Sequence, residues 1–297
     1  MDITADVVRS IYTGVQTSFQ QGRALYTPTW SNIATEVSST TATEDYGWMG
    51  EFSKLREWIG DREVNKMELH TYSLRNKKFE GTEGISKDYI EDNRLGGVFK
   101  KFEDMGYAAS SHPDELVYEC LANGTKNLCY DGQPFFDAEH PMGDGNNKTL
   151  VSNIQDGSGV PWYLMDARRP LKPLIFQKRR DYKLTAKTDD GTSDRVFMAD
   201  EYLYGVDARV NAGYGFWQQA FMSKAELTAD NFNAAFKQMR QLKSDKGRPL
   251  GIKPNLLVVG AEHLAAANQL IKAMQKAGGA SNTNYNQVQV LDSEWLD

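Results

Sequence analysis

The spacing of apolar side chains changes several times along the chain, and each change marks a different predicted element. The strongest pattern covers residues 86–124, where apolar positions recur every three or four residues, as on one face of an α-helix. A continuous helix of this length would extend about 40 Å, and Asn123-Gly124 would end it. We expect Pro113 either to kink this helix or to begin a second one, with Ser111 as the candidate N-cap. The apolar stripe comprises Val98, Phe99, Phe102, Met105, Ala109, Leu116, Val117, Cys120 and Leu121.

The first 45 residues form a less regular segment. They begin with a short amphipathic stretch, but residues 38–43 are small and almost all polar, so they cannot supply a core of their own. We therefore predict an N-terminal arm over residues 1–45 that is ordered only where it lies along something else, such as a neighbouring subunit. Residues 46–61 then carry apolar side chains at helical spacing up to Gly60.

Residues 62–87 have a weaker and more polar pattern. Met67 and Leu69 alternate with polar residues, and the phase then slips so that Tyr72 and Leu74 alternate instead. The sequence RNKK at 75–78 suits a turn, which predicts a long polar hairpin. A hairpin with so few apolar side chains is only marginally stable by itself. We therefore expect it to pack against something outside its own domain.

The second half of the chain changes from strands to helices. Residues 160–222 are interpreted as extended strands, because three prolines near their start exclude a helix there. A turn is expected at Asp189–Gly191. Residues 227–276 then have a helix–strand–helix pattern whose first helix is capped by Thr228. Residues 286–297 begin as a further strand.

Composition narrows the class of protein without identifying a reaction. The 297 residues are 40% hydrophobic and 25% charged with a net charge of −6, an ordinary balance for one large domain or two smaller ones. A mildly acidic chain is not a dedicated nucleic-acid-binding protein. The start of the chain lacks an apolar signal region, and no apolar run approaches about 18 residues, so we expect neither secretion nor a membrane span.

Two residue types add to this picture. The chain has 14 Tyr, 13 Phe and 6 Trp, and aromatic side chains bury large areas and are favoured at protein interfaces. Only two cysteines occur, which indicates a reducing compartment rather than a disulfide framework.

One short stretch, CYDGQPFFDAEHP at residues 129–141, collects side chains that are common in active sites. Structural zinc ligands come in close pairs of Cys or His, and an EF-hand needs acids at alternate positions before a glycine, and neither spacing occurs here. No nucleophile signature surrounds the cysteine. We therefore expect no catalytic residue, no metal and no cofactor. The candidate ligands and nucleophiles in the stretch are Cys129, Asp131, Asp137, Glu139 and His140.

The same stretch has a structural interpretation that we prefer. Cys129, Phe135 and Phe136 would be packed, and Asp137 would accept backbone N–H bonds in a turn. A metal-dependent hydrolase that uses Asp137 and His140 is the alternative. The basic residues of 168–183 are better explained by salt bridges or a solvated face than by phosphate binding.

Six segments, taken in order, resemble the major head subunit of Mu-like phages and prophages. The resemblance extends from about residue 46 to the end of the chain, and the first 45 residues match less clearly. The segments are EFSKLREWIGDREVNKMELHTYSLRNKKFEGTEGISKDYIEDNRLG, AASSHPDELVYECL, CYDGQPFFDAEHP, WYLMDARRPLKPLIFQKR, YGVDARVNAGYGFWQQA and GRPLGIKPNLLVVG.

This resemblance implies an α+β fold of the Hong Kong 97 capsid type. Such a fold has an N-terminal arm, an extended E-loop, a peripheral domain with a long spine helix, and an axial domain. The corresponding division of this chain is the arm at 1–45, a lead-in helix at 46–61, the E-loop at 62–87, the peripheral domain at 88–222, and the axial domain with a C-terminal strand at 223–297.

The resemblance also implies a function. The chain would be a major capsid protein, not an enzyme, that assembles through hexamers and pentamers into an icosahedral shell around double-stranded DNA. It would bind DNA without sequence specificity and would not involve a membrane. The implied partners are copies of the same chain, a scaffold, a portal and a head-maturation protease, and the implied location is the virion, assembled in the host bacterial cytoplasm. An encapsulin-type cellular shell protein is the alternative with the same fold.

Overall fold

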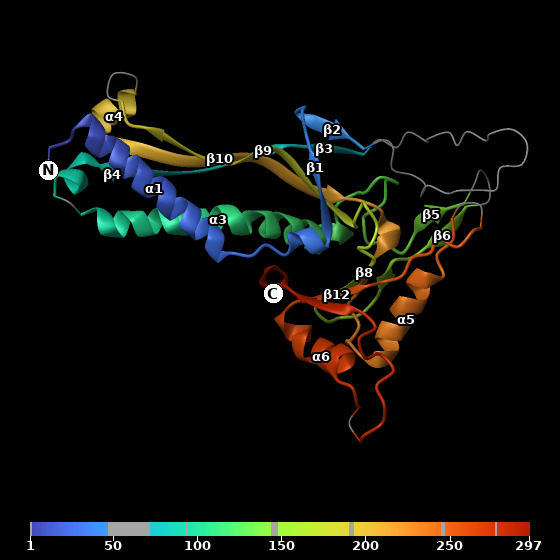
Figure 1. The fold of residues 1–297 in the computed structure, drawn as a ribbon. Coiled ribbons are helices and arrows are strands. Elements are labelled where there is room, and N and C mark those ends of the chain that lie inside the picture. Colours follow the sequence, from blue (N-terminus) through green and yellow to red (C-terminus); the bar gives the residue numbers. More distant parts are fainter. Residues whose placement is uncertain are drawn as a thin grey trace, which may run out of the picture.

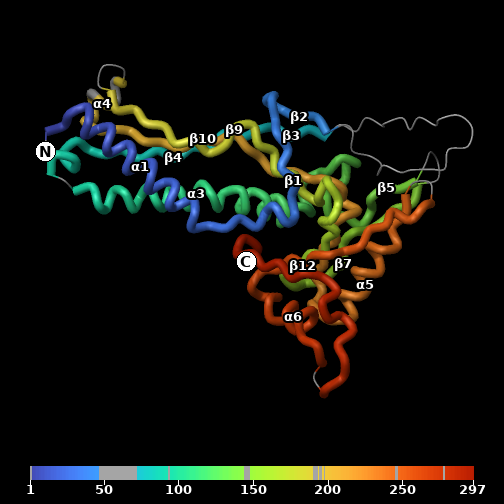
Figure 2. The backbone as a smooth tube through the Cα atoms, in the orientation of Figure 1, coloured from blue at the N-terminus to red at the C-terminus, as the bar shows by residue number. Residues whose placement is uncertain are grey.

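The computed structural model describes residues 2–46, 72–92, 94–143, 148–189, 193–244, 247–276 and 278–297. They form an elongated part and a wedge-shaped part (Figure 1). The elongated part contains the two long helices and one sheet, and the wedge contains a second sheet and two shorter helices. The N-terminus lies at the far end of the elongated part, whereas the C-terminus lies where the two parts meet (Figure 2).

Two long strands form the centre of the first sheet. β9 (Leu174–Lys187) and β10 (Glu201–Tyr214) pair antiparallel, and their register shifts on both sides of Arg209. β4 (Lys77–Ser86) pairs antiparallel with the other side of β10, and β1 (Ala34–Ser38) pairs parallel with β9. The strand order is β1-β9-β10-β4, so β1 and β4 are the two edges.

The long helix α3 (Leu95–Ala122) runs along one face of this sheet and contacts β9 and β10 (Figure 1). Its 28 residues make it about 42 Å long. The side chains that define its apolar stripe, such as Phe102, Val117 and Leu121, are fully buried. The sheet is not the only element that covers this helix, because the N-terminal helix also packs against it.

The N-terminal helix α1 (Ala5–Leu25) covers much of the remaining surface of α3. Its buried side chains Ile11, Val15 and Phe19 join the same hydrophobic cluster as Phe102. The two backbones touch, because a Cβ atom at Gly22 would lie 1.7 Å from the Glu103 carbonyl oxygen. At Gly106 a Cβ atom would lie 2.0 Å from the Phe19 carbonyl oxygen. Only glycine permits this close approach at either position.

A buried carboxylate, Asp114, fixes the segment that follows α1 to the C-terminal half of α3. It accepts hydrogen bonds from the backbone N–H groups of Thr29 at 2.9 Å and Trp30 at 2.7 Å. The hydroxyls of Thr29 and Tyr26 donate to it at 3.1 and 2.7 Å. The indole N–H of Trp295 in turn donates to the Tyr26 hydroxyl at 3.1 Å. The arm, α3 and the C-terminal end of the chain therefore meet at one side chain.

The second sheet has five strands in the order β13-β12-β8-β11-β7. Helices α5 (Ala229–Arg240) and α6 (Ala261–Lys272) flank this sheet in the wedge (Figure 1). The core here is continuous with that of the first sheet and includes the fully buried Trp162 and Phe232. The strands are β7 (Ile154–Gln155), β8 (Trp162–Met165), β11 (Ala220–Ser223), β12 (Leu256–Val259) and β13 (Gln289–Asp292).

The remaining elements are short connections. Two small antiparallel pairs join β2 to β3 and β5 to β6. None of the described helices combines the length and the apolar character that a membrane-spanning segment requires. The short elements are β2 (Thr43–Asp45), β3 (Ser73–Arg75), β5 (His140–Met142), β6 (Thr149–Val151), α2 (Lys87–Glu91), α4 (Asp194–Ala199) and 3-10 turns at Trp30–Asn32, Asn123–Thr125, Trp217–Gln219 and Glu294–Leu296.

Several helical predictions are confirmed. Asn123 is the C-cap of α3, and the Thr228 hydroxyl accepts the N–H of Asn231 at the start of α5. Pro113 lies inside one continuous helix, so of the two alternatives predicted for it the second helix does not occur. Ser111 does not act as an N-cap, because its hydroxyl donates to the Ala108 carbonyl one turn earlier.

The predicted hairpin turn at 75–78 is wrong. Only Asn76 separates β3 from β4, and these two strands pair with β2 and β10 instead of with each other. β10 offers a ten-residue partner for β4, which a polar hairpin strand could not supply. The lead-in helix predicted at 46–61 and the first strand of the hairpin lie outside the described residues, apart from Tyr46.

The arm lies along another element, as predicted, and that element is α3 of the same chain rather than a neighbouring subunit. The strands of 160–222 do not form one unit, because β8 and β11 belong to the second sheet while β9 and β10 belong to the first. The turn predicted at Asp189–Gly191 lies outside the described residues, apart from Asp189, and helix α4 stands between it and β10.

The glycine contact between α1 and α3 gives a direct test of this packing. We expect Gly106→Ala to lower the free energy of unfolding of the soluble subunit by about 2 kcal/mol, because the added methyl group forces the two helices apart. Gly97→Ala, in the exposed first turn of α3 with nothing near its Cβ position, is the matched control and should raise stability by about 0.5 kcal/mol. Urea unfolding followed by circular dichroism measures both, and equal effects would contradict the close contact.

Candidate functional site

The chain that leaves α3 brings three of the sequence-predicted candidates together: Cys129, Asp131 and His140. Their potential ligand atoms all lie within 4.8 Å of one another. A tight turn places the first two, because the Cys129 N–H donates to the Gln133 carbonyl at 2.8 Å. Gly132 within this turn has a φ of 84°, a conformation that favours glycine. His140 comes from the start of β5.

The imidazole of His140 is held on two sides. Its ring stacks on Trp217 with the centroids 4.0 Å apart and the planes 7° from parallel. Its Nδ1 lies 2.7 Å from an Asp131 carboxylate oxygen. The other oxygen of Asp131 accepts the Cys129 thiol and the Gln133 N–H, each at 3.1 Å. Asp131 thus joins a turn, a strand and a buried aromatic ring.

Burial and hydrogen bonding set the protonation of this cluster. Burial by itself would raise the pKa of the Asp131 carboxyl, but the hydrogen bonds from His140 and Cys129 outweigh it and hold that pKa below its usual value. Burial raises the pKa of the Cys129 thiol far above its ordinary value, and the neighbouring Asp131 carboxylate raises it further. The sulfur is therefore a neutral thiol at physiological pH and a weak nucleophile.

This arrangement fits a structural role better than a metal or catalytic one. Two ligands of a tetrahedral zinc ion, each about 2.0–2.1 Å from it, lie about 3.3 Å apart, whereas Asp131 and His140 are at hydrogen-bonding distance. His140 is fully buried and Cys129 is 4% exposed, so a substrate cannot reach either side chain. Cys129, Asp131 and His140 form a hydrogen-bonded clamp that joins the loop after α3 to the turn at Trp217.

Asp137, the predicted partner of His140 in a hydrolase, lies elsewhere in the turn. Its carboxylate accepts the Glu139 N–H at 2.7 Å, as expected for a turn-forming aspartate. Its own N–H donates to the Asn153 side chain at 2.9 Å. The structure pairs His140 with Asp131, and sequence spacing gave no reason to prefer this aspartate. Phe135 and Phe136 are buried, as predicted.

A second polar network closes the base of the segment between β2 and β3. One oxygen of Glu44 accepts the Ser39 hydroxyl and the N–H groups of Thr40 and Thr41 at 2.8–3.0 Å. These hydrogen bonds, led by that from the Thr41 backbone, lower the pKa of Glu44 from 4.5 to about 2. The side-chain amide of Asn76 donates to Ser39 at 2.7 Å and so ties the same corner to β4.

The buried Gln177 on β9 anchors this corner to the first sheet. Its amide nitrogen donates to the Leu74 carbonyl at 3.0 Å and to the Asn76 side chain at 2.9 Å. Its amide oxygen accepts the Tyr46 hydroxyl at 2.8 Å. Tyr46 and Tyr72 are joined by a backbone hydrogen bond of 2.7 Å. The two ends of the segment 47–71 are therefore held at a fixed place on the sheet.

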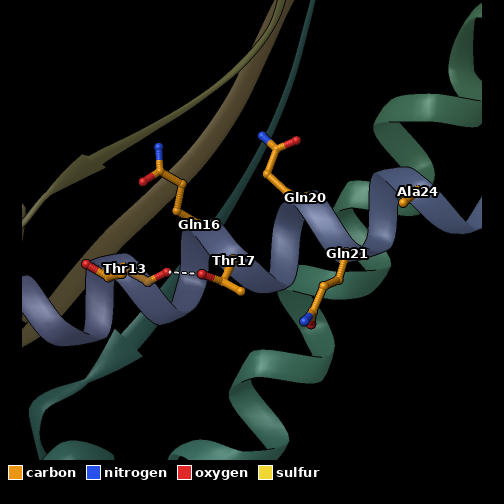
Figure 3. Close-up of a pocket in the computed structure, with 6 residues that line it drawn as sticks. All are labelled: Thr13, Gln16, Thr17, Gln20, Gln21 and Ala24. Carbon is orange, nitrogen blue, oxygen red and sulfur yellow. Dashed lines mark hydrogen bonds between the residues drawn. The ribbon is translucent and has the colours of Figure 1, made fainter.

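The outer face of α1 is polar but carries no charge along the stretch drawn in Figure 3. Five amide and hydroxyl side chains, with Ala24, line a shallow hollow of about 510 Å³. The Thr17 hydroxyl is occupied by the Thr13 carbonyl at 2.8 Å. The residues that line this hollow include no titratable side chain. The five polar side chains are Thr13, Gln16, Thr17, Gln20 and Gln21.

Comparison with known proteins gives a consistent result. The family described as Mu-like prophage major head subunit gpT matches residues 8–296. The major capsid protein of Escherichia phage Mu is 42% identical over 308 aligned positions that cover all of both chains. The Mu-like prophage FluMu major head subunit of Haemophilus influenzae is 41% identical and covers 93% of this chain and 92% of its own.

A solved structure agrees with these relatives. The chain from the procapsid of bacteriophage JBD30 superposes with a TM-score of 0.86 at 45% sequence identity. The match covers 99% of this chain and 100% of that chain. The similarity therefore includes both sheets, the long helix and the N-terminal segment that sequence patterns matched less clearly.

We expect the clamp to contribute to stability rather than to turnover. His140→Ala removes a fully buried ring and leaves the Asp131 carboxylate without its strongest donor, so it should lower the free energy of unfolding by about 3 kcal/mol. Asp137→Ala removes one turn hydrogen bond and should cost about 1 kcal/mol. Urea unfolding of the soluble subunit measures both. A hydrolytic or metal-dependent activity that both changes abolish, with stability unaltered, would contradict the structural role.

The Glu44 network should make stability depend on acid pH. Because folding lowers the Glu44 pKa from 4.5 to about 2, its contribution is present above pH 4.5 and is lost as the pH falls towards 2. We expect the melting temperature of Glu44→Gln to lie below that of the wild type at pH 6 and to converge with it near pH 2. Asp45→Asn, the next residue of β2, controls for the change in net charge. A constant difference across this range would refute the assignment.

Proposed function

This chain belongs to the family of Mu-like prophage major head subunits and is a major capsid protein with a Hong Kong 97-type fold, and we propose that its copies close into an icosahedral shell around double-stranded DNA. The observation that carries this proposal is full-length similarity to subunits of assembled heads, in both sequence and structure. Hexamers and pentamers of one chain require heterologous contacts that close into rings.

The exposed surface of the subunit supports such contacts. β1 and β4 are edge strands of the first sheet, and exposed edges need cover or charge in a protein that stays soluble. Several large apolar side chains are solvent-exposed on the isolated subunit, as expected where a neighbour completes the packing. Examples are Leu25, Leu150, Met198 and Met274.

We assign the parts of the fold by analogy with the capsid type. The first sheet with α3 would be the peripheral domain, and α3 its spine helix. The second sheet with α5 and α6 would be the axial domain, which then includes β7, β8 and β11 as well as most of the predicted 223–297 region. Residues 47–71, together with their stem at β2 and β3, would serve as the E-loop, so the predicted boundary at 87 moves towards the N-terminus.

The proposed partners follow from head assembly. Copies of the same chain form the shell, and a scaffold, a portal and a head-maturation protease would act during assembly in the host bacterial cytoplasm. The chain would enclose DNA without reading its sequence, consistent with its net charge of −6. We propose no enzymatic activity, since the reactive side chains that the structure brings together, Cys129, Asp131 and His140, are buried and hydrogen-bonded to one another.

Replacement of residues 47–71 tests this assignment. Because the Tyr46 N–H donates to the Tyr72 carbonyl at 2.7 Å, a short Gly-Ser linker can bridge these two positions without disturbing β2 or β3. We expect the wild type to form closed shells in negative-stain electron microscopy. The replacement variant should be a folded, soluble subunit that forms none.

Two kinds of outcome would contradict these proposals. Normal shells from the variant would refute the E-loop assignment while leaving the capsid function intact. The proposed function itself would be refuted if the wild type formed no shells. It would also be refuted if shells formed during phage growth contained a packaged enzyme in place of DNA.

A further inference from the structure

Four cationic side chains line one hollow on the first sheet, where β3 leads into β4. The hollow has a volume of about 570 Å³ and is lined by Arg75, Lys77, Lys78 and Arg209. Asn76 and Asn211 lie between them, and both amides are already engaged. The Asn76 amide donates to the Ser39 hydroxyl at 2.7 Å, and the Asn211 amide donates to the Arg75 carbonyl at 2.8 Å. These bonds hold the backbone that carries the cations.

None of these four cations forms an ion pair with a residue of the described ranges. Lys78 lies directly opposite Arg209 in the β4–β10 ladder, so two like charges share one face of neighbouring strands. Such a pair is destabilising unless a negative charge lies nearby. By contrast, other cations of the same sheet are paired, as Lys178 on β9 is with Glu36 at 2.7 Å and Arg180 on β9 is with Asp207.

Protection of the sheet edge does not explain this cluster. Lysines on an edge strand such as β4 can prevent aggregation by themselves. Arg209, however, lies on the interior strand β10, and its Nε atom is buried without an acceptor. A buried cationic N–H group without a partner costs free energy. No described carboxylate pairs with these four cations, although Glu80 and Asp207 follow along the same face, so the hollow can accept a further anionic group.

The charges beside the hollow favour one anionic group over a long polyanion. The next pair along the same face of β4 and β10 is Glu80 opposite Asp207. Asp207 is itself ion-paired with Arg180 on β9. A nucleic-acid backbone running along these strands would meet two carboxylates directly after the cations. A single Asp or Glu side chain would fit the cationic hollow without reaching them.

We propose that this hollow binds a carboxylate side chain from a second copy of the chain and so forms an inter-subunit salt bridge in the shell. The inference rests on the proposed assembly function. The chain itself provides suitable ligands, because it has 40 acidic residues against 34 basic ones. Guanidinium and ammonium groups that converge on a carboxylate at an interface give orientation as well as attraction.

Charge reversal of the two exposed lysines is the first test. We expect the double variant Lys77→Glu, Lys78→Glu to raise the protein concentration needed for assembly about tenfold, equivalent to about 1.4 kcal/mol per subunit contact. Its dependence on salt should also weaken, because salt screens attraction between exposed charges. Lys187→Glu on β9 of the same sheet, about 23 Å away along the strands, is the control for charge reversal outside the hollow and should assemble as the wild type does. Thermal unfolding checks that both variants fold.

Cross-linking identifies the partner. A zero-length carbodiimide reagent joins lysines to carboxylates that are in contact, and shells built from mixed isotopically light and heavy subunits separate inter-chain from intra-chain products by mass. We expect light–heavy cross-links from Lys77 or Lys78 to one Asp or Glu. The Lys101–Glu83 pair should give intra-chain products as an internal control.

The outcomes separate this inference from the assembly function. Unchanged assembly of the double variant, or cross-links from Lys77 and Lys78 only within one chain, would overturn the salt bridge while shells still form. Loss of binding to a short DNA duplex in the double variant, with assembly unchanged, would assign the hollow to nucleic acid instead. If neither the wild type nor Lys187→Glu forms shells, the proposed function fails first, and the inter-subunit salt bridge that rests on it is overturned as well.

Discussion

The buried carboxylate of Asp114 is the constraint on which the arrangement of the subunit depends. A charged group is expensive to bury unless donors surround it, and here two backbone N–H groups and two hydroxyls do so. The donors belong to the chain that leaves α1 and enters β1. Once they are fixed on α3, the direction of the arm and the position of one sheet edge are set together.

The same principle recurs at other junctions between elements. Asp131 joins the loop after α3 to the ring of His140, and the stacked Trp217 connects that ring to the turn before β11. Glu44 and Gln177 join the β2–β3 stem to β9. In each case a polar side chain accepts or donates several hydrogen bonds from separate elements, which fixes their relative positions. A subunit that must match identical neighbours gains from such fixed geometry.

Charged side chains at the surface differ from those in the interior in how far the chain itself pairs them. Buried carboxylates are satisfied within the chain, but the four cations beside β4 are not paired with any described residue. The exposed apolar side chains and the two sheet edges are likewise surface groups that a second copy of the chain could cover. A subunit of a closed shell differs in this way from a monomeric enzyme, because part of its energetics is completed only by another copy.

Local patterns in the sequence were sufficient for the helices. The apolar stripe of α3, its C-terminal end and the Thr228 cap of α5 depend on hydrogen bonds between residues four or fewer positions apart, so the sequence determined them directly. The family resemblance extended the prediction from single helices to the fold and the function. Strand partners were not determined in this way. The sequence of a polar strand such as β4 does not indicate whether the strand pairs with a hairpin neighbour or with β10, more than a hundred residues away. The Asp131–His140 pair, the Gly22 and Gly106 contact and the cationic hollow were likewise decided by the tertiary structure, since each depends on which distant backbones come close together.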